Sequence, residues 1–325
     1  MDMGGTTEGE TPTGPSTEPE LGRGRFIEVG EGVFAWIQQD GTWWINNAGL
    51  VVGDESTMLV DTCTTERRTQ ELLDESAGVS GAKPLQYAVN THHHGDHTYG
   101  NSLLPRETCL IGHSRMREAL LADQTLTDFP PYWSPKPDFG NLSFRVPDLT
   151  IETQASVHLG GQHVELVHPG CVALTAGDLV AWVPDARVLF VGDLLFPGHT
   201  PMILAGTPSG AIRALDWIAS FDADVIVPGH GEVIERADIA GVLADHRRYY
   251  EFVVAEAAKG VRQDLSPLEV ARRTDLGEFA HLMDPERFVL NIHSAYAENA
   301  GTTATRAQAF EDVVTWLGTP LRTRV

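Results

Sequence analysis

The chain has 325 residues, of which 42% are hydrophobic, so it can bury a sizeable core as one large domain or as a domain with an appendage. Its 45 acidic residues outnumber its 23 basic residues and give a formal charge of −22. A surface this acidic repels phosphate backbones and anionic lipids, so we expect no nucleic-acid partner and no membrane partner.

The first segment, residues 1–24, consists largely of Gly, Thr, Pro and Glu and is predicted to be a disordered tail. It lacks the basic start and apolar stretch of a secretory signal. The three cysteines, Cys63, Cys109 and Cys171, stand far apart, which argues against a disulfide framework and fits a reducing compartment. We therefore expect a cytoplasmic protein with one folded domain over residues 25–325.

The folded part begins with short apolar runs that are separated by turns. Strands are predicted at 33–37, 48–52, 58–60 and 85–89, and an amphipathic helix at 65–75. The dipeptide Gly53-Asp54 is typical of a hairpin turn between the second and third of these strands. A strand at 108–111 and a helix at 114–122 complete the first half.

Residues 123–148 are rich in Pro, Asp and aromatic side chains and predict no regular element, so they form either a binding loop or a plain connection. Beyond them, strands are predicted at 150–153, 164–167, 179–183, 188–191 and 225–227, with a helix at 210–220. From about residue 238 the pattern is helical. This order of elements predicts an α/β protein in which two sheets pack together with helices outside.

Four potential metal ligands occur within six residues, directly after the strand at 85–89. The segment reads His92-His93-His94-Gly95-Asp96-His97. In an extended backbone, His92 and His94 point to the same side because side chains alternate. Gly95 permits a sharp turn, after which Asp96 and His97 can face a second point nearby. Imidazole and carboxylate groups are ligands that zinc accepts, so the segment predicts a metal site.

The same segment resembles the HxHxDH signature of the metallo-β-lactamase superfamily. Three further motifs share the resemblance: Asp61 after an early strand, Asp193 in Phe190-Val191-Gly192-Asp193, and His230 in Pro228-Gly229-His230-Gly231. The resemblance implies an αββα sandwich of two mixed β-sheets with helices outside. Within the superfamily, the chain is most similar to a bacterial group that includes thioesterase/cyclases of aromatic polyketide pathways.

The resemblance also implies a role for each matching residue. His92 and His94 would bind a metal at the first site. Asp96, His97 and His230 would bind a metal at the second site, and Asp193 would bridge the two. Asp61 would orient ligands without binding metal. The expected cofactor is one or two zinc ions, and Asp96 would also act in catalysis by orienting the attacking water or taking its proton.

One position departs from the family pattern, in which a further His followed by Thr completes the first site. Here Leu174 precedes Thr175, and leucine cannot bind metal. In an extended segment, side chain 174 would point into the cluster. His168, Cys171 and His199 lie nearby in the sequence as substitute ligands, and His199 is alternatively a substrate contact.

The function that the resemblance implies is hydrolysis of an ester, thioester or lactone by metal-activated water, in a thioesterase or cyclase of polyketide metabolism. A β-lactamase or lactonase is one alternative. A degenerate protein with an incomplete first site at Leu174 is the other. The expected partner is a small-molecule or carrier-protein-bound substrate, and the C-terminal helices could carry a homo-oligomer contact.

Overall fold

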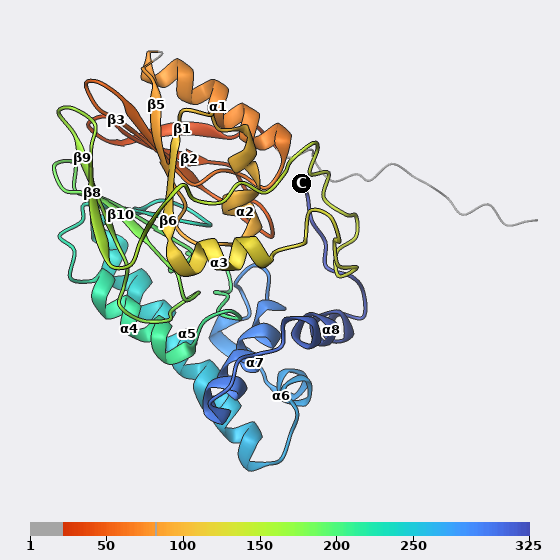
Figure 1. Ribbon diagram of the computed structural model, residues 1–325. Coiled ribbons are helices and arrows are strands. Elements are labelled where there is room, and N and C mark those ends of the chain that lie inside the picture. The colour runs from red at the N-terminus through yellow and green to blue at the C-terminus, as the bar shows by residue number, and fades with distance from the viewer. Residues whose placement is uncertain (1–21, 82) are drawn as a thin grey trace, which may run out of the picture.

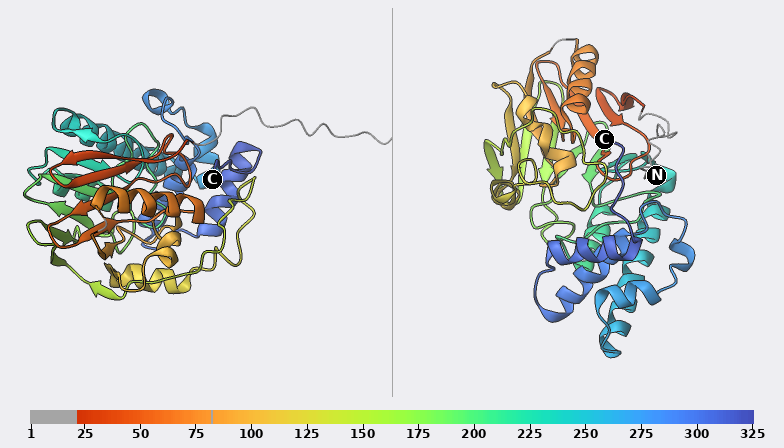
Figure 2. Two further views of the ribbon diagram at one scale, coloured as in Figure 1. Left: turned by 90° about the horizontal axis from the view of Figure 1, so that it is seen from above. Right: turned by 90° about the vertical axis from the view of Figure 1, so that its right-hand side faces the viewer.

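The computed structural model describes residues 22–81 and 83–325, so the predicted tail at 1–24 lies almost entirely outside the described residues. Within the described residues, two mixed β-sheets pack face to face and helices cover the outer faces (Figures 1 and 2). The fold class predicted from the sequence is confirmed.

The first sheet has the strand order β1-β2-β3-β4-β5-β6-β7, and its pairing is parallel from β4 to β7. Its strands are β1 (Arg25–Gly30), β2 (Val33–Ile37), β3 (Ala48–Val52), β4 (Thr57–Val60), β5 (Leu85–Val89), β6 (Cys109–His113) and β7 (Leu149–Ile151). The second sheet has the order β13-β12-β11-β10-β9-β8, in which only β11 and β12 pair in parallel. Its strands are β8 (Gln154–His158), β9 (His163–Val167), β10 (Val180–Val183), β11 (Val188–Gly192), β12 (Val225–Pro228) and β13 (Ile234–Glu235).

The first half of the chain carries the helices α1 (Glu66–Ser80), α2 (Gly95–Thr98), η1 (Tyr99–Leu103) and α3 (Ser114–Ala122). The second half carries α4 (Pro208–Ile218), α5 (Arg236–Arg262), α6 (Pro267–Arg273), η2 (Gly277–Phe279), α7 (Arg287–Ala300) and α8 (Arg306–Leu317). Helices α5 to α8 correspond to the helical pattern expected from about residue 238. Among the described residues, none of these helices is long and apolar enough to cross a membrane.

Three separate groups of buried apolar side chains explain why the chain forms four layers. In β4, Met58 and Val60 face the second sheet, whereas Leu59 faces α1 on the outside. In β11, Phe190 faces the first sheet, whereas Val191 faces the helices α4, α5 and α7. Because side chains alternate along a strand, an unbroken apolar strand is buried on both faces and must lie in an inner layer.

The elements that the sequence failed to predict are the strands β1, β8 and β13 and the short helices α2 and η1. Most residues of β1 and β8 are exposed or only partly buried, because these strands lie at sheet edges. A half-exposed strand lacks the apolar run that identifies an inner strand. Strand β13 has only two residues, and that is too short for any periodic pattern.

The pairing of the parallel strands places the chemically informative residues together. Asp61 follows β4 and the histidine segment follows β5, while Asp193 follows β11 and His230 follows β12. Parallel neighbours end at the same side of their sheet, as β4 and β5 do in the first sheet and β11 and β12 in the second. The residues that follow these two pairs lie close together in the sandwich. Four segments far apart in the sequence therefore deliver side chains to one region.

Candidate metal centre

The histidine segment leaves β5 through a bend at residues 91–93 and then enters the short helix α2. His94 has φ −65° and ψ 149°, which is extended backbone, and stands directly before that helix, whereas His97 lies within it. Gly95 is needed here for a reason that the sequence did not reveal. A Cβ atom at this position would lie 2.2 Å from the Tyr99 ring, so only glycine allows that ring to pack against the turn.

The structure brings all six expected ligands into one cluster. His92, His94 and Asp193 form one group of donors, which we call the first site. Asp96, His97, Asp193 and His230 form another group, which we call the second site. Within each group the ligand atoms lie within 4.8 Å of one another. Asp193 belongs to both sites, as expected of a bridging residue.

The distances within the cluster are those of groups that face a common point. At the second site, His97 Nε2 lies 3.1 Å from Asp193 Oδ1, and His230 Nε2 lies 3.1 Å from Asp96 Oδ2. At the first site, His92 Nε2 lies 3.0 Å from His94 Nδ1 and 3.5 Å from Asp193 Oδ2. Ligands of a tetrahedral zinc ion with bonds of ~2.0–2.2 Å stand about 3.4 Å apart, so these separations suit a metal.

Asp61 contacts the histidine segment through both carboxylate oxygens and does not belong to either group of ligands. One carboxylate oxygen accepts a hydrogen bond from the Thr91 N–H at 2.7 Å. The other lies 2.8 Å from His97 Nδ1 and accepts from the Thr91 hydroxyl at 2.7 Å. That hydroxyl in turn lies 3.0 Å from His92 Nδ1. Asp61 therefore orients one histidine of each site, directly for His97 and through Thr91 for His92.

His230 is oriented by a backbone group that no sequence pattern indicated. Its Nδ1 lies 2.8 Å from the carbonyl oxygen of Gly41, in the loop between β2 and β3. An acceptor at Nδ1 keeps the proton there and leaves Nε2 free to bind a metal. The close approach also requires Gly229, because a Cβ atom there would lie 1.9 Å from Asp193 Oδ1.

The charges of the cluster shift the pKa values of its members in opposite directions. Burial opposes the charged form of His230, but Asp193 and Asp96 outweigh it and raise the pKa to about 9. The same competition, with Asp61 added, raises the pKa of His97 well above its usual value. The histidines likewise hold the pKa of Asp193 and Asp96 below the usual range against the effect of burial. The buried carboxylates thus stabilise positive charge within the cluster.

Two buried atoms at the centre of the cluster lie close together without forming a hydrogen bond. His97 Nε2 and Asp193 Oδ1 are 3.1 Å apart, and within the described residues neither has a hydrogen-bond partner. Buried polar atoms usually form hydrogen bonds, so this arrangement fits two ligands that face a common ion. Imidazole nitrogens and carboxylate oxygens at these separations fit a divalent metal ion.

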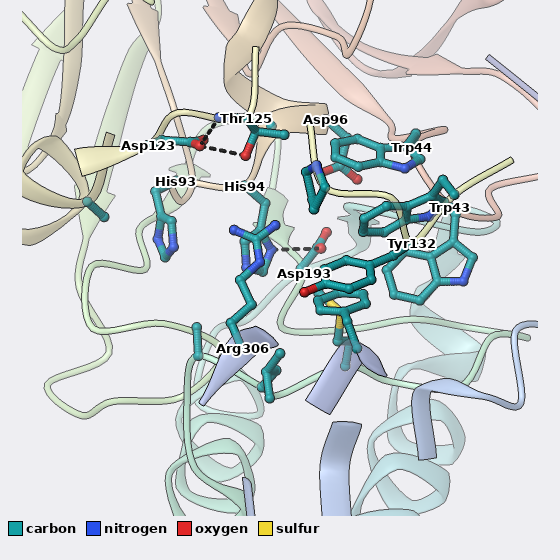
Figure 3. A pocket seen from close by; sticks show the side chains of 18 of the residues that line it. Trp43, Trp44, His93, His94, Asp96, Asp123, Thr125, Tyr132, Asp193 and Arg306 are labelled. Atoms are coloured by element: carbon teal, nitrogen blue, oxygen red, sulfur yellow. Dashed lines mark hydrogen bonds and ion pairs between the residues drawn. The ribbon is translucent and has the colours of Figure 1, made fainter. Parts of the chain in front are cut away.

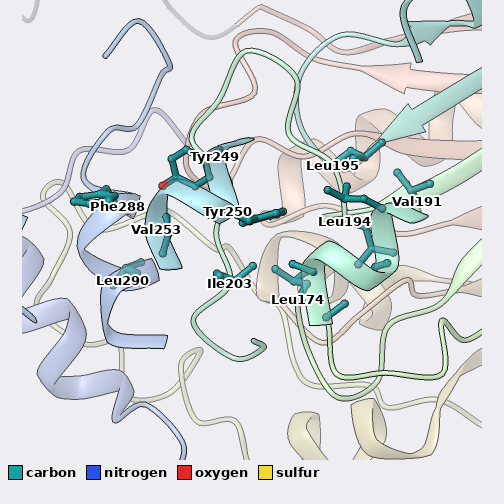
Figure 4. Close-up of a cluster of buried hydrophobic side chains, with 14 of the residues drawn as sticks. Leu174, Val191, Leu194, Leu195, Ile203, Tyr249, Tyr250, Val253, Phe288 and Leu290 are labelled. Atoms are coloured by element: carbon teal, nitrogen blue, oxygen red, sulfur yellow. The ribbon is translucent and has the colours of Figure 1, made fainter. Parts of the chain in front are cut away.

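Leu174 does not face the cluster, which corrects the expectation drawn from an extended segment. It is 2% exposed and packs in the apolar group that contains Leu194, Ile203 and Tyr250 (Figure 4). The segment is a turn because the Asp178 carboxylate accepts hydrogen bonds from the backbone N–H groups of residues 174 and 175. A turn does not alternate its side chains as a strand does, so the expected direction was wrong.

The three substitute ligands lie outside both groups of donors. His168 Nδ1 lies 2.8 Å from the Asp178 carbonyl oxygen, and its ring packs against His113. Cys171 Sγ contacts the Gly210 carbonyl oxygen at 3.6 Å. Both ring nitrogens of His199 face backbone carbonyls, at 3.0 Å from Pro197 and 3.1 Å from Asp40. Each side chain is already engaged elsewhere, so the structure brings none of them to the first site.

A cavity of about 570 Å³ opens onto the cluster (Figure 3). Its floor contains His94, Asp96, Asp193 and His230. Residues of the long irregular segment between 123 and 133 form part of the wall, which places them where the predicted binding loop would contact a ligand. The lining also includes Arg287, Ala304, Arg306, Ala307 and Phe310 from the C-terminal helical part. His93 also lines the cavity, with its ring 5.0 Å from that of His94, and it does not join the ligands.

Comparison with known proteins agrees with the fold and with the ligand cluster. The profile of the Metallo-beta-lactamase superfamily matches residues 41–230. The linear primary-alkylsulfatase of Pseudomonas sp. (strain ATCC 19151) is 24% identical over 263 residues, or 70% of this chain and 49% of that protein. The hydroxyacylglutathione hydrolase of Synechococcus sp. (strain JA-3-3Ab) is 27% identical over 216 residues, or 63% of this chain and 74% of that protein.

A solved structure extends the likeness over more of the chain. The stereoselective inverting sec-alkylsulfatase of Pseudomonas sp. superposes with a TM-score of 0.66 and 17% identity, covering 88% of this chain and 51% of that one. This chain thus spans about half the length of either alkylsulfatase. At this identity the superposition shows a shared fold.

Proposed function

Because the chain belongs to the metallo-β-lactamase superfamily, we propose that it is a metal-dependent hydrolase whose substrate binds in the cavity above the histidine–aspartate cluster. The observation that carries the proposal is the convergence of the six ligand side chains beside that cavity, in two groups whose ligand atoms lie within 4.8 Å of one another. At the centre of the cluster, His97 Nε2 and Asp193 Oδ1 lie 3.1 Å apart without a hydrogen bond, which suits two ligands of one ion.

The metal that suits the donor set is zinc, held by His92, His94 and Asp193 at the first site and by Asp96, His97, Asp193 and His230 at the second. When bound, such an ion lowers the pKa of a coordinated water towards about 7 and polarises the bond under attack. The protein's own contribution is orientation. Asp61 and the Gly41 carbonyl fix the imidazoles, so that their Nε2 atoms converge without rearrangement.

Asp96 is the carboxylate best placed for proton transfer. Its side chain is 13% exposed, whereas that of Asp193 is 2% exposed, and both line the cavity. A carboxylate that keeps contact with the cavity can orient an attacking water or accept its proton. We therefore assign catalytic proton handling to Asp96 and charge compensation to Asp193.

The proposed substrates are esters, thioesters and lactones. One relative is named as a hydroxyacylglutathione hydrolase and two as alkylsulfatases, so sulfate esters join the list. Action as a β-lactamase, or on a carrier-bound polyketide thioester, stays a prediction. A second candidate function, a weakly catalytic binding protein, is favoured by the apolar surroundings of Leu174, which leave the first site with three donors.

Two measurements on purified protein test these proposals. Elemental analysis should find at least one zinc per chain, and a panel of ester, thioester, lactone, lactam and sulfate-ester substrates should reveal turnover that needs the metal. His97→Ala should lose both. Arg67→Gln, which removes a charge from an exposed position on α1, should keep both. Bound metal without turnover on any substrate would favour the binding protein, and absence of metal would contradict both functions.

A further inference from the structure

The cavity contains an arginine that the metal chemistry does not use. Arg306 is the first residue of α8, is exposed, and lines the cavity wall. Figure 3 shows its side chain extending into the pocket towards the side where His93 and His94 lie. Its guanidinium carbon lies 5.7 Å from the centre of the Phe310 ring. Across residues 22–81 and 83–325, no carboxylate forms an ion pair with it.

The other arginine of the cavity is bound within the protein. Arg287 is 2% exposed, forms an ion pair with Asp284 at 2.7 Å, and lies 4.5 Å from the Trp43 ring centre. Of the carboxylates that also line the cavity, Asp123 accepts hydrogen bonds from Thr125 and Tyr99, and Asp128 is exposed to solvent. Arg306 is thus the cavity's available cation, although acidic residues outnumber basic ones about twofold in this chain.

The start of α8 adds to the positive potential around Arg306. Its first turn contains no acidic residue, and Thr305 makes no side-chain hydrogen bond to cap the helix. The unpaired N–H groups of a helix start carry partial positive charge. Because Ala304, Arg306 and Ala307 all line the cavity, this end of the helix faces the same space as the guanidinium.

The part of the wall next to Arg306 and Phe310 is aromatic. The rings of Tyr132 and Phe310 are stacked at 5.3 Å, and Trp133 lies 5.0 Å from Phe310. Trp44 contacts Trp133 at 5.3 Å and extends the wall to the loop after β2. Rigid aromatic surfaces favour flat apolar ligands.

We propose that the substrate combines a flat apolar body, which packs on this aromatic wall, with an oxyanion that binds Arg306 at the start of α8. This rests on the proposed function and deepens it. The reacting bond lies over Asp96 and Asp193, and the oxyanion, a carboxylate or a sulfonate-type group, lies at the α8 end. Arg306 acts as a specificity residue, because guanidinium pairs with carboxylate and sulfur oxyanions through charge-assisted hydrogen bonds.

The experiment measures binding without turnover. Calorimetric titration of the metal-loaded protein compares naphthalene-2-carboxylate and naphthalene-2-sulfonate with the neutral naphthalene-2-carboxamide. We expect both anions to bind about tenfold more tightly than the amide, since the pairing is charge-assisted but partly exposed. Arg306→Gln should remove the preference without lowering the melting temperature. The matched charge removal Arg67→Gln should preserve it, and high salt should weaken it.

Each outcome decides something. Equal affinity for the three ligands would overturn the proposal, as would a preference that survives Arg306→Gln. A carboxylate preference that disappears with the metal, without any sulfonate preference, would show that the anion binds metal and would also overturn it. An active hydrolase without anion preference would refute this inference alone. An inactive protein that still prefers both anions through Arg306 would refute the proposed hydrolysis alone.

Discussion

On one side of Asp193 lie His92 and His94, and on the other lie Asp96, His97 and His230. The second site contributes four donors, and its histidines are oriented by the Asp61 carboxylate and the Gly41 carbonyl. The first site contributes three donors. His92 is oriented by the neutral Thr91 hydroxyl, and the His94 side chain is 18% exposed. Two sites that share a bridging residue can therefore differ in how well the fold orients their ligands before metal binds. We expect a metal ion to occupy the second site first.

Removing one histidine from each site should give the largest effects and the sharpest contrast. His97→Ala deletes a second-site ligand and should lower the affinity of the second site for metal by more than about 100-fold. Loss of a ligand should cost more than loss of a residue that only orients a ligand, which lowers metal affinity by ~10–100-fold. His94→Ala should leave that metal in place. Metal content after exhaustive dialysis and competition with a chromophoric chelator measure both. Similar losses in the two variants would contradict the comparison.

The two sites should also respond differently to pH. Without metal, the pKa of His230 is raised to about 9, so both ring nitrogens carry a proton at neutral pH, including Nε2, which faces the second site. Metal must displace that proton, so second-site affinity should rise about tenfold per pH unit for each proton displaced between pH 6 and 9. Burial and His92 lower the pKa of His94, so the first site should change less. Metal titrations at pH 6, 7 and 8 give the slopes, and parallel slopes would remove the distinction.

Asp61→Ala should reduce second-site affinity by about 10–100-fold by releasing His97. The first site should lose less, since its link to Asp61 passes through Thr91. Asp74→Ala on the exposed surface of α1 is a matched control and should change neither affinity. If Asp61→Ala weakened the first site more than the second, the assigned orientation would be wrong.

The smallest effect is expected from Leu174→His, which tests whether the first site can be completed. The imidazole would enter an apolar group and should destabilise the metal-free protein by about 1–3 kcal/mol. If the turn shifts enough to present it, bound zinc should rise towards two per chain and hydrolysis should increase. Leu174→Met keeps the volume and should leave the zinc content unchanged. Two zinc ions in parent and variant alike would show that this position never limited the site.

The sequence was sufficient to predict those ligands that a short local motif identifies. The histidine segment, Asp193 and His230 each follow an apolar inner strand, and parallel pairing brings the strand ends together. The direction of Leu174 was predicted wrongly because hydrogen bonds to Asp178 make a turn where alternation suggested a strand.

What the sequence could not provide depends on contacts between distant segments. The Gly41 carbonyl that orients His230 is a backbone group 189 positions away, and every residue has a carbonyl. Arg306 belongs to a helix that looks like any solvated helix until the structure places it beside the loop at 123–133. Within the part of the chain that the structure describes, no carboxylate forms an ion pair with it, and that fact is visible only in three dimensions.

The floor of the cavity and the C-terminal part of its wall have different origins along the chain. The ligands all lie within residues 41–230, whereas Arg287, Arg306 and Phe310 lie beyond them. Substitutions in this C-terminal part can therefore accumulate without replacing a ligand, and the reverse also holds. In evolutionary terms, the two parts can diverge at different rates. A lineage could exchange its preferred substrate by replacing the last helices while it inherits the metal chemistry unchanged.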